Sequence, residues 1–250
     1  MKSVELFLVL IGLVAVAQAT LDFCDKALCG GVPHIGCNNT MLFASTCSAD
    51  KKLAFMDSEH KKIILAAHNN NRNLIASGNN TKFQPASRMA TMVWDEELAT
   101  LATFLVRTCK YTNDCHNTDN FRNSGQNIAM SLSNMPHTWA AKNISEQMVN
   151  TWFAQSNDAT MADLNSYNPS KNIGGFATIV IDNNYRVGCA GAFFQNPDYK
   201  DYPFAYFFAC NYATTPVPNK PIYSSGPSGS KCTTGKNSAY SALCSTKEQY

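Results

Sequence analysis

The sequence predicts an α+β fold held together by disulfide bonds, and three observations support this prediction. Patterns typical of helices occupy the first part of the chain, and short β-branched and aromatic runs occupy the second. Because the two kinds do not alternate, an antiparallel sheet with separate helices is favoured over a doubly wound parallel sheet. The chain also carries 10 cysteines in 250 residues, an even number that can pair completely.

The start of the chain predicts a secretory signal peptide. A short basic beginning is followed by the apolar run 6–17 and by the small-x-small site Ala17-Gln18-Ala19, so we expect residues 1–19 to be removed by cleavage after Ala19. A transmembrane helix needs about 20 apolar residues, and neither this run nor any later stretch is long enough. We therefore expect a secreted, extracellular protein without a transmembrane segment.

Composition and cysteine spacing narrow the class further. A net charge of +2 with only 15% charged residues argues against nucleic-acid binding, and 45% hydrophobic residues argue against disorder. The cysteines form no Cys-x-x-Cys pair, so disulfides are favoured over a zinc site. Glycosylation sequons at Asn38, Asn79 and Asn143 agree with secretion.

The cysteine-rich segment 20–56 shows no clear period and is expected to be irregular. The main domain is expected at 57–215, and its first helix begins where Asp57 or Ser58 can cap it. The apolar positions of this helix continue toward Ile75.

Two further helices are expected in the domain. Asp95 is a suitable N-cap for the second, whose apolar stripe ends at Cys109. The third runs from Ser145 and places the polar Gln155 on an otherwise apolar face.

Three strands and a tail complete the expected organisation. The strands lie at 174–181, 187–194 and 204–212, and we expect them to form an antiparallel sheet. The Pro/Gly/Ser-rich tail 216–250 is expected to be extended, with a small loop that the pair Cys232 and Cys244 can close.

Five stretches carry a resemblance to a known family. They are Phe23–Cys37 with its three cysteines, His68-Asn69 with Arg72, Gly125-Gln126-Asn127-Ile128-Ala129, Phe207-Phe208-Ala209-Cys210-Asn211-Tyr212, and the tail from Cys232 to Cys244. In this order they resemble the CAP proteins (cysteine-rich secretory, antigen 5 and pathogenesis-related), and most of all the antigen 5-related proteins of insect venom and fly saliva.

The resemblance implies a fold and a disulfide pattern that residue spacing alone leaves open. It implies a three-layer α-β-α sandwich with a central antiparallel sheet. The pairs that it implies are Cys24–Cys37, Cys29–Cys115, Cys47–Cys109 and Cys189–Cys210, which leaves Cys232–Cys244 as the fifth.

Many CAP proteins hold a divalent metal such as zinc in a pocket of two histidines and two acidic residues. The resemblance places Asn113, Gln126, Gln155 and Gly175 at these four positions. The loop at Asn113 is one residue shorter than usual, so His116 is an alternative occupant. Carboxamides lack the charge that attracts a cation and cannot act as acid or base near neutral pH. The expected pocket is polar, neutral and degenerate, with no metal and no other cofactor.

No catalytic motif appears in the chain, and His68 is expected to be a structural histidine of the core. The predicted function is a non-enzymatic antigen 5-like binding protein of arthropod saliva or venom, and an allergen. Its expected partners are host immune or haemostatic proteins or a small hydrophobic lipid, and we expect a monomer. The alternative is a metal-dependent hydrolase with an altered pocket. Integrin binding through Arg-Gly-Asp is excluded, because the chain lacks that tripeptide.

Overall fold

The computed structural model describes residues 22–250 except 49, 137 and 197. The predicted signal peptide therefore lies outside the described residues. Within the described part of the chain, no helix is both long and apolar enough to cross a bilayer.

A central sheet and the helices around it make up the fold. The strands are β1 (Lys52–Leu53), β2 (Val93–Trp94), β3 (Gly125–Ser133), β4 (Arg186–Gln195) and β5 (Phe204–Tyr212). The α-helices are α1 (Ser58–Ser77), α2 (Glu96–Val106), α3 (Ala141–Ala154), α4 (Met161–Asn165) and α5 (Gly174–Val180), with short 3-10 turns η1 (Thr138–Ala140) and η2 (Gln155–Asn157).

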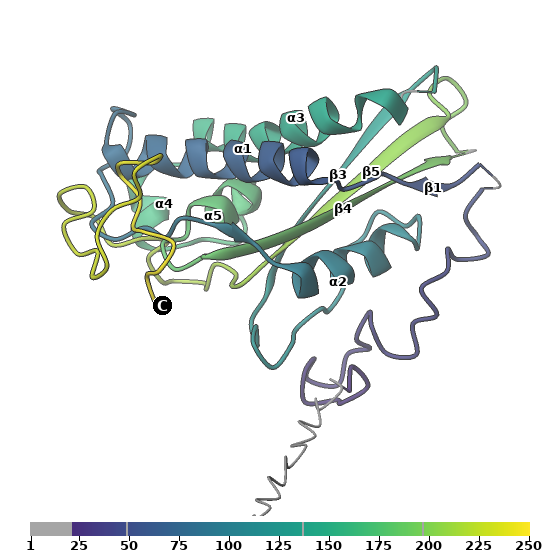
Figure 1. The fold of residues 1–250 in the computed structure, drawn as a ribbon, viewed down its shortest axis with the longest axis horizontal. Coiled ribbons are helices and arrows are strands. Elements are labelled where there is room, and N and C mark those ends of the chain that lie inside the picture. Colours follow the sequence, from purple (N-terminus) through teal and green to yellow (C-terminus); the bar gives the residue numbers. More distant parts are fainter. Residues whose placement is uncertain (1–21, 49, 137, 197) are drawn as a thin grey trace, which may run out of the picture.

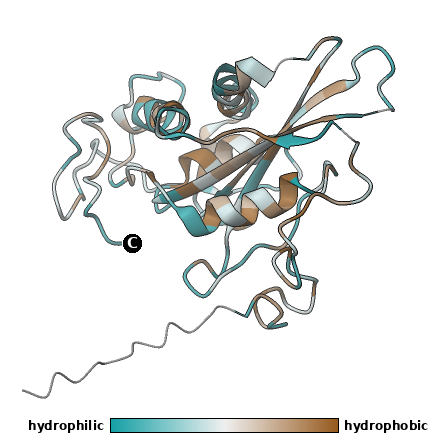
Figure 2. Cartoon of the chain, turned by 45° about the vertical axis from the view of Figure 1, so that its right-hand side comes forward, coloured by the Kyte–Doolittle hydropathy of each residue, from teal (hydrophilic) through white to brown (hydrophobic). Residues whose placement is uncertain are grey.

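The elements stack as a three-layer α-β-α sandwich, which confirms the predicted fold class. The sheet order is β1-β4-β5-β3, with β2 joined to β4, and β5 runs antiparallel to both of its neighbours. Figure 1 shows α1 and α3 side by side on one face of the sheet and α2 on the other. Apolar residues gather on the strands and on α2, where the layers meet (Figure 2).

Helices α1 and α2 begin where the sequence predicts. The carboxylate of Asp57 accepts a hydrogen bond from the His60 amide at 2.7 Å, and that of Asp95 accepts one from the Leu98 amide at 3.1 Å. These bonds satisfy amides that no helical carbonyl can reach. Helix α3 begins at Ala141, earlier than the predicted start at Ser145.

The predicted strand at 174–181 is wrong, because most of this segment forms helix α5. All side chains from 176 to 180 are buried, and a short apolar run that is buried on every side has no period that distinguishes strand from helix. Contacts from other elements decide the outcome. The Gln155 side chain accepts from the Phe176 amide at the start of α5, and Arg72 donates to the Ile179 carbonyl at its end.

Strand β3 was not among the predicted strands. It pairs with every residue of β5, from Gly125 opposite Tyr212 to Ser133 opposite Phe204. Its glycine, asparagine and serines have low strand propensity, so this strand depends on its neighbour rather than on its own residues. The other two predicted strands are present as β4 and β5.

Five disulfides join the cysteines in the same pairs that the resemblance implies: Cys24–Cys37, Cys29–Cys115, Cys47–Cys109, Cys189–Cys210 and Cys232–Cys244. Two of them attach the irregular N-terminal segment to the end of α2 and to the loop that follows it. One links the neighbouring strands β4 and β5.

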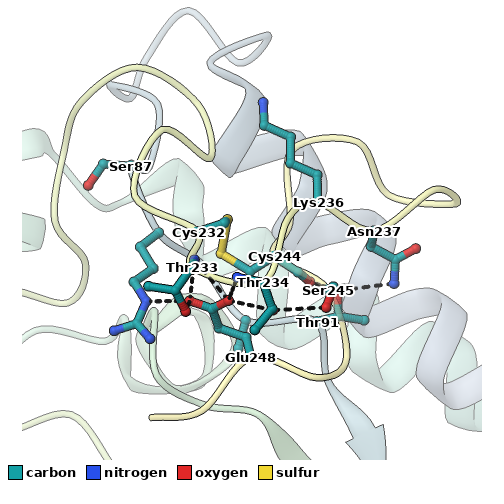
Figure 3. The surroundings of a disulfide bond; sticks show 12 residues. Ser87, Thr91, Cys232, Thr233, Thr234, Lys236, Asn237, Cys244, Ser245 and Glu248 are labelled. Carbon is teal, nitrogen blue, oxygen red and sulfur yellow. Dashed lines mark hydrogen bonds and ion pairs between the residues drawn. A yellow bond between two sulfur atoms is a disulfide. The ribbon is translucent and has the colours of Figure 1, made fainter.

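The tail 216–250 has no helix or strand, yet it is folded against the domain rather than simply extended. Ile222 and Leu243 are fully buried in the main core. Figure 3 shows Glu248 beside the Cys232–Cys244 disulfide, where its carboxylate accepts hydrogen bonds from the amides of Thr233 and Thr234 at 2.8–3.0 Å. The buried carboxylate of Glu248 thus joins the end of the tail to its segment at Thr233 and Thr234.

Candidate functional site

The five pocket residues that the sequence singles out line one cleft. They are Asn113, His116, Gln126, Gln155 and Gly175, and the cleft has a volume of about 480 Å³. The loop before β3, the start of β3, the end of α3 and the start of α5 form its walls. Residues far apart in the chain therefore meet in one cleft.

Gln126 lies at the centre of a network of amides. Its Oε1 accepts from Asn113 Nδ2 at 3.0 Å and from the Asp114 amide at 3.2 Å. Its Nε2 donates to Asn211 Oδ1 at 2.9 Å, and Asn211 is the residue opposite it on β5. The carboxamide thus uses both its oxygen and its nitrogen within the protein. A carboxylate could not donate the second bond.

His116 is buried, and protein groups lie within hydrogen-bond distance of both of its ring nitrogens, including Gln126 Nε2 at 3.3 Å from Nδ1. Nδ1 lies 2.9 Å from Asp114 Oδ1, and Nε2 lies 3.0 Å from the Gly125 carbonyl oxygen. A metal-binding imidazole needs one nitrogen lone pair directed at the ion. In this arrangement both nitrogens of His116 already contact protein groups, and neither is free for an ion in the cleft.

Gln155 occupies the space that a side chain at position 175 would need. Its Oε1 accepts from the Phe176 amide at 3.1 Å. A Cβ atom built on Gly175 would lie 3.0 Å from that oxygen and 3.1 Å from Trp152 Cβ, which is tighter than ordinary contact. The glutamine and the glycine therefore fit each other, and a histidine at position 175 would displace Gln155.

These residues do not fit a divalent metal ion. Zinc takes three or four histidine, cysteine or carboxylate ligands, and no group of three such side chains comes together within the described residues. The cleft contributes His116 and Asp114, which are bound to each other. Asp114 Oδ2 is buried without a hydrogen-bond partner in the described structure, but one carboxylate oxygen is no ligand set.

The histidine-containing stretch of α1 has a structural role, as expected for His68. His68 is fully buried between the Ile64 carbonyl at 2.8 Å and the Tyr212 hydroxyl at 2.9 Å. Asn69 both donates to the Met92 carbonyl and accepts from the Met92 amide. None of these side chains lines the cleft.

The sequence analysis did not identify two residues of the cleft network, Asp114 and Asn211. Asp114 directly precedes the paired Cys115, and its proximity to His116 was the available signal. Asn211 lies within the recognised 207–212 stretch, and only the β3–β5 register reveals that it meets Gln126.

The predicted glycosylation residues Asn38, Asn79 and Asn143 are all exposed. The third sequon differs from the others, because the Ser145 hydroxyl is buried and hydrogen-bonded to His60 and Tyr206.

The sandwich, its five disulfides and the cleft between β3, α3 and α5 define a disulfide-bonded α-β-α protein of the CAP type. The sequence model of the cysteine-rich secretory protein (CAP) family matches residues 65–212. The chain belongs to this family.

Insect relatives extend the similarity over most of the chain. Venom allergen-1 of Aedes aegypti is 35% identical over 240 residues, which is 94% of this chain and 92% of the relative. The antigen 5 like allergen Cul n 1 of Culicoides nubeculosus is 35% identical over 182 residues, 68% of this chain and 82% of the relative. The crystal structure of NaASP2 with Zn2+ superposes with a TM-score of 0.60 at 20% identity, over 76% of this chain and 96% of that one. This last likeness concerns the fold alone.

Proposed function

We propose that this chain is a secreted, non-enzymatic binding protein of arthropod saliva or venom that acts on host immune or haemostatic components. The hydrogen-bond network of the cleft supports the proposal that the protein is not an enzyme. Gln126 and Gln155 use their side-chain oxygens to accept hydrogen bonds from the protein itself. The similarity to insect venom and antigen 5 allergens supports the secreted and allergenic parts of the proposal.

The chemistry of the cleft opposes the alternative of a metal-dependent hydrolase. Such an enzyme needs a metal-activated water and an acid or base that changes protonation near neutral pH. Asn113, Gln126 and Gln155 cannot change protonation there, and His116 is held at both nitrogens.

Zinc titration of the purified, disulfide-intact protein tests this proposal. We expect no stoichiometric zinc by elemental analysis and no 1:1 heat signal in calorimetry. The double variant Asn113→His/Gln126→Glu adds an imidazole and a carboxylate beside the unpartnered Oδ2 of Asp114, and it should bind zinc at least about tenfold more tightly than the parent chain. Stoichiometric zinc in the parent chain that is lost in His116→Gln would contradict the proposal.

A second candidate function, sequestration of a small lipid, is favoured by a groove at the other end of the sheet. This groove has a volume of about 590 Å³. Phe193, Phe194 and Phe204 supply its aromatic part, and Lys51, Lys52 and Asp50 supply its charged groups, of which two are cationic and one is anionic. Neither lysine takes part in an ion pair among the described residues. An apolar slot with a few polar groups suits an acyl chain that carries an anionic head.

Native mass spectrometry and titration with a fluorescent fatty acid test the lipid function. We expect binding in a 1:1 ratio, weakened at least about tenfold in Lys52→Glu because the charge at the groove is reversed. Lys62→Glu is the matched control, since Lys62 is an exposed lysine of α1 that does not line the groove. If no fatty acid binds, or if both variants weaken binding equally, host proteins remain the proposed partners.

A further inference from the structure

The two edges of the central sheet are built very differently. One edge is β1, which has only two residues and includes Lys52. The other edge is β3, which has nine residues and pairs only with β5. Strand β3 contains no charged residue and no proline, and its register with β5 runs without a bulge. Short length, charge, proline and bulges are the features that keep edge strands from pairing with other chains. β1 has two of them, and β3 has none.

Hydrogen bonds at Ile128 indicate which backbone groups of β3 point away from β5. The Ile128 carbonyl accepts from Trp152 Nε1 at 3.1 Å and from the Tyr111 hydroxyl at 3.3 Å. Outward-pointing residues alternate along an antiparallel strand, so Met130 and Leu132 direct their N–H and C=O groups outward as well. Within the described residues, no hydrogen bond meets these outward groups. The edge is therefore covered at the Ile128 carbonyl and open at Met130 and Leu132.

The side chains along this open part of β3 suit contact with another strand. Ile128, Met130 and Leu132 are partly buried apolar residues at the border of the core cluster beneath α2. Helix α2 packs on β4 and β5 rather than on β3, so it does not cover these side chains completely. The alternate positions of this part, Ser131 and Ser133, are small.

We propose that β3 pairs antiparallel with β3 of a second copy of this chain, about a two-fold axis at Ser131. Met130 then lies opposite Leu132 of the second copy, and each such pair exchanges two backbone hydrogen bonds. This register uses the outward N–H and C=O groups of both Met130 and Leu132. A shift by two residues in one direction requires the Ile128 carbonyl, which already has two donors, and a shift in the other requires residue 134, beyond the strand.

We assign a second copy of this chain as the partner of the β3 edge because the two β3 strands are complementary to each other. The pairing covers Met130 and Leu132 of each copy with apolar side chains and brings no like charges together within the strands. The net charge of +2 opposes self-association only weakly. The contact is small, so the dimer is weak and depends on concentration. This proposal replaces the monomer expected from sequence.

Engineered cysteines test the register. Ser131 lies opposite its own copy in a pair without hydrogen bonds, where the two Cα atoms are about 4.5 Å apart, within disulfide range. We expect Ser131→Cys to give a disulfide-linked dimer on mild oxidation, seen by non-reducing gel and intact mass. Ser133→Cys is the matched control, because its two copies would be about 14 Å apart along the strands, and its yield should be at least about tenfold lower. Equal yields, or no dimer from Ser131→Cys, would overturn the proposal.

Sedimentation of the full mature chain provides a second test without new cysteines. We expect a reversible monomer–dimer equilibrium in roughly the micromolar to millimolar range. Ser131→Glu and Ser131→Lys should each raise the dimer dissociation constant at least about tenfold, because each places like charges on the axis, and an equal mixture of the two should restore association. A parent chain that stays monomeric throughout this range overturns the proposal, as does a dimer that Ser131→Glu leaves unchanged.

Discussion

Replacing Arg72 by methionine should destabilise the fold by more than about 3 kcal/mol, the largest effect that we expect from a single side chain outside the disulfides. The guanidinium of Arg72 is completely buried and comes from the last third of α1. It donates five hydrogen bonds of 2.6–3.2 Å to the carbonyls of residues 90, 179, 181 and 182. Burial lowers the pKa of Arg72 to about 10, which leaves it charged at neutral pH.

The cost of removing this side chain comes mostly from what it leaves behind. The carbonyls of Ile179 and Ala90 would stay buried and lose the Arg72 donor, and each unsatisfied group costs about 1–3 kcal/mol. The Ile181 carbonyl would keep only the Asn184 amide, at 3.3 Å. Methionine keeps part of the apolar stem, so the variant removes mainly the hydrogen bonds. Arg72→Lys should fall between the parent and the methionine variant, because one ammonium group cannot reach all of these carbonyls.

Urea denaturation with intact disulfides measures the difference. Arg122→Met is the matched control, since Arg122 is exposed and pairs with Asp119 on the surface, where an ion pair contributes less than about 1 kcal/mol. Similar unfolding midpoints for Arg72→Met and Arg122→Met would show that the buried network does not support the fold. If Arg72→Met does not accumulate, the comparison between Arg72→Lys and Arg122→Met decides.

Arg72 also explains where sequence reasoning succeeded and where it failed. The N-caps Asp57 and Asp95 act on amides three residues away, so local sequence is enough to place the starts of α1 and α2. Helix α5 depends on Gln155 at one end and Arg72 at the other, and both are distant in sequence. Local propensity for a strand was overridden by contacts that only the tertiary structure provides.

The cleft was likewise predictable only in part from the sequence. The family resemblance identified Asn113, Gln126 and Gly175 as its residues, and they do line it together. Sequence did not reveal that Gln126 is bound to Asn211, because the partner depends on the register between β3 and β5. Composition alone also could not show that His116 is held at both ring nitrogens by groups of its own loop and strand.

Acid should weaken the protein in a pH range set by its buried histidines, the second large effect that we expect. His68 is held neutral: Nδ1 faces the Ile64 carbonyl, and Nε2 can accept from the Tyr212 hydroxyl. Burial lowers the pKa of His68 from 6.5 to about 4. Burial also lowers the pKa values of His34 and His60, against the opposing effect of backbone carbonyls at their rings.

The folded state prefers the neutral form of His68, and this preference sets the direction of the pH effect. A histidine whose folded-state pKa is lowered contributes its full stability above the unfolded value of 6.5. That contribution is lost as the pH falls toward about 4, because the unfolded chain takes up the proton first. For His68 alone the loss between pH 7 and pH 5 is about 2 kcal/mol.

Unfolding midpoints between pH 7 and pH 5 test this expectation against the variant His68→Gln. Glutamine can donate and accept as the neutral imidazole does but cannot be protonated in this range, so the variant should lose less stability over the interval by about 2 kcal/mol. Glu248→Gln serves as the control. Burial favours a raised pKa for Glu248, but donors on Thr233, Thr234 and Arg88 lower this pKa to about 2. Protonation of Glu248 should therefore change the stability of the fold only below pH 4.5. An equally steep pH dependence in the parent and in His68→Gln would show that the buried histidine on α1 is not a source of the acid sensitivity.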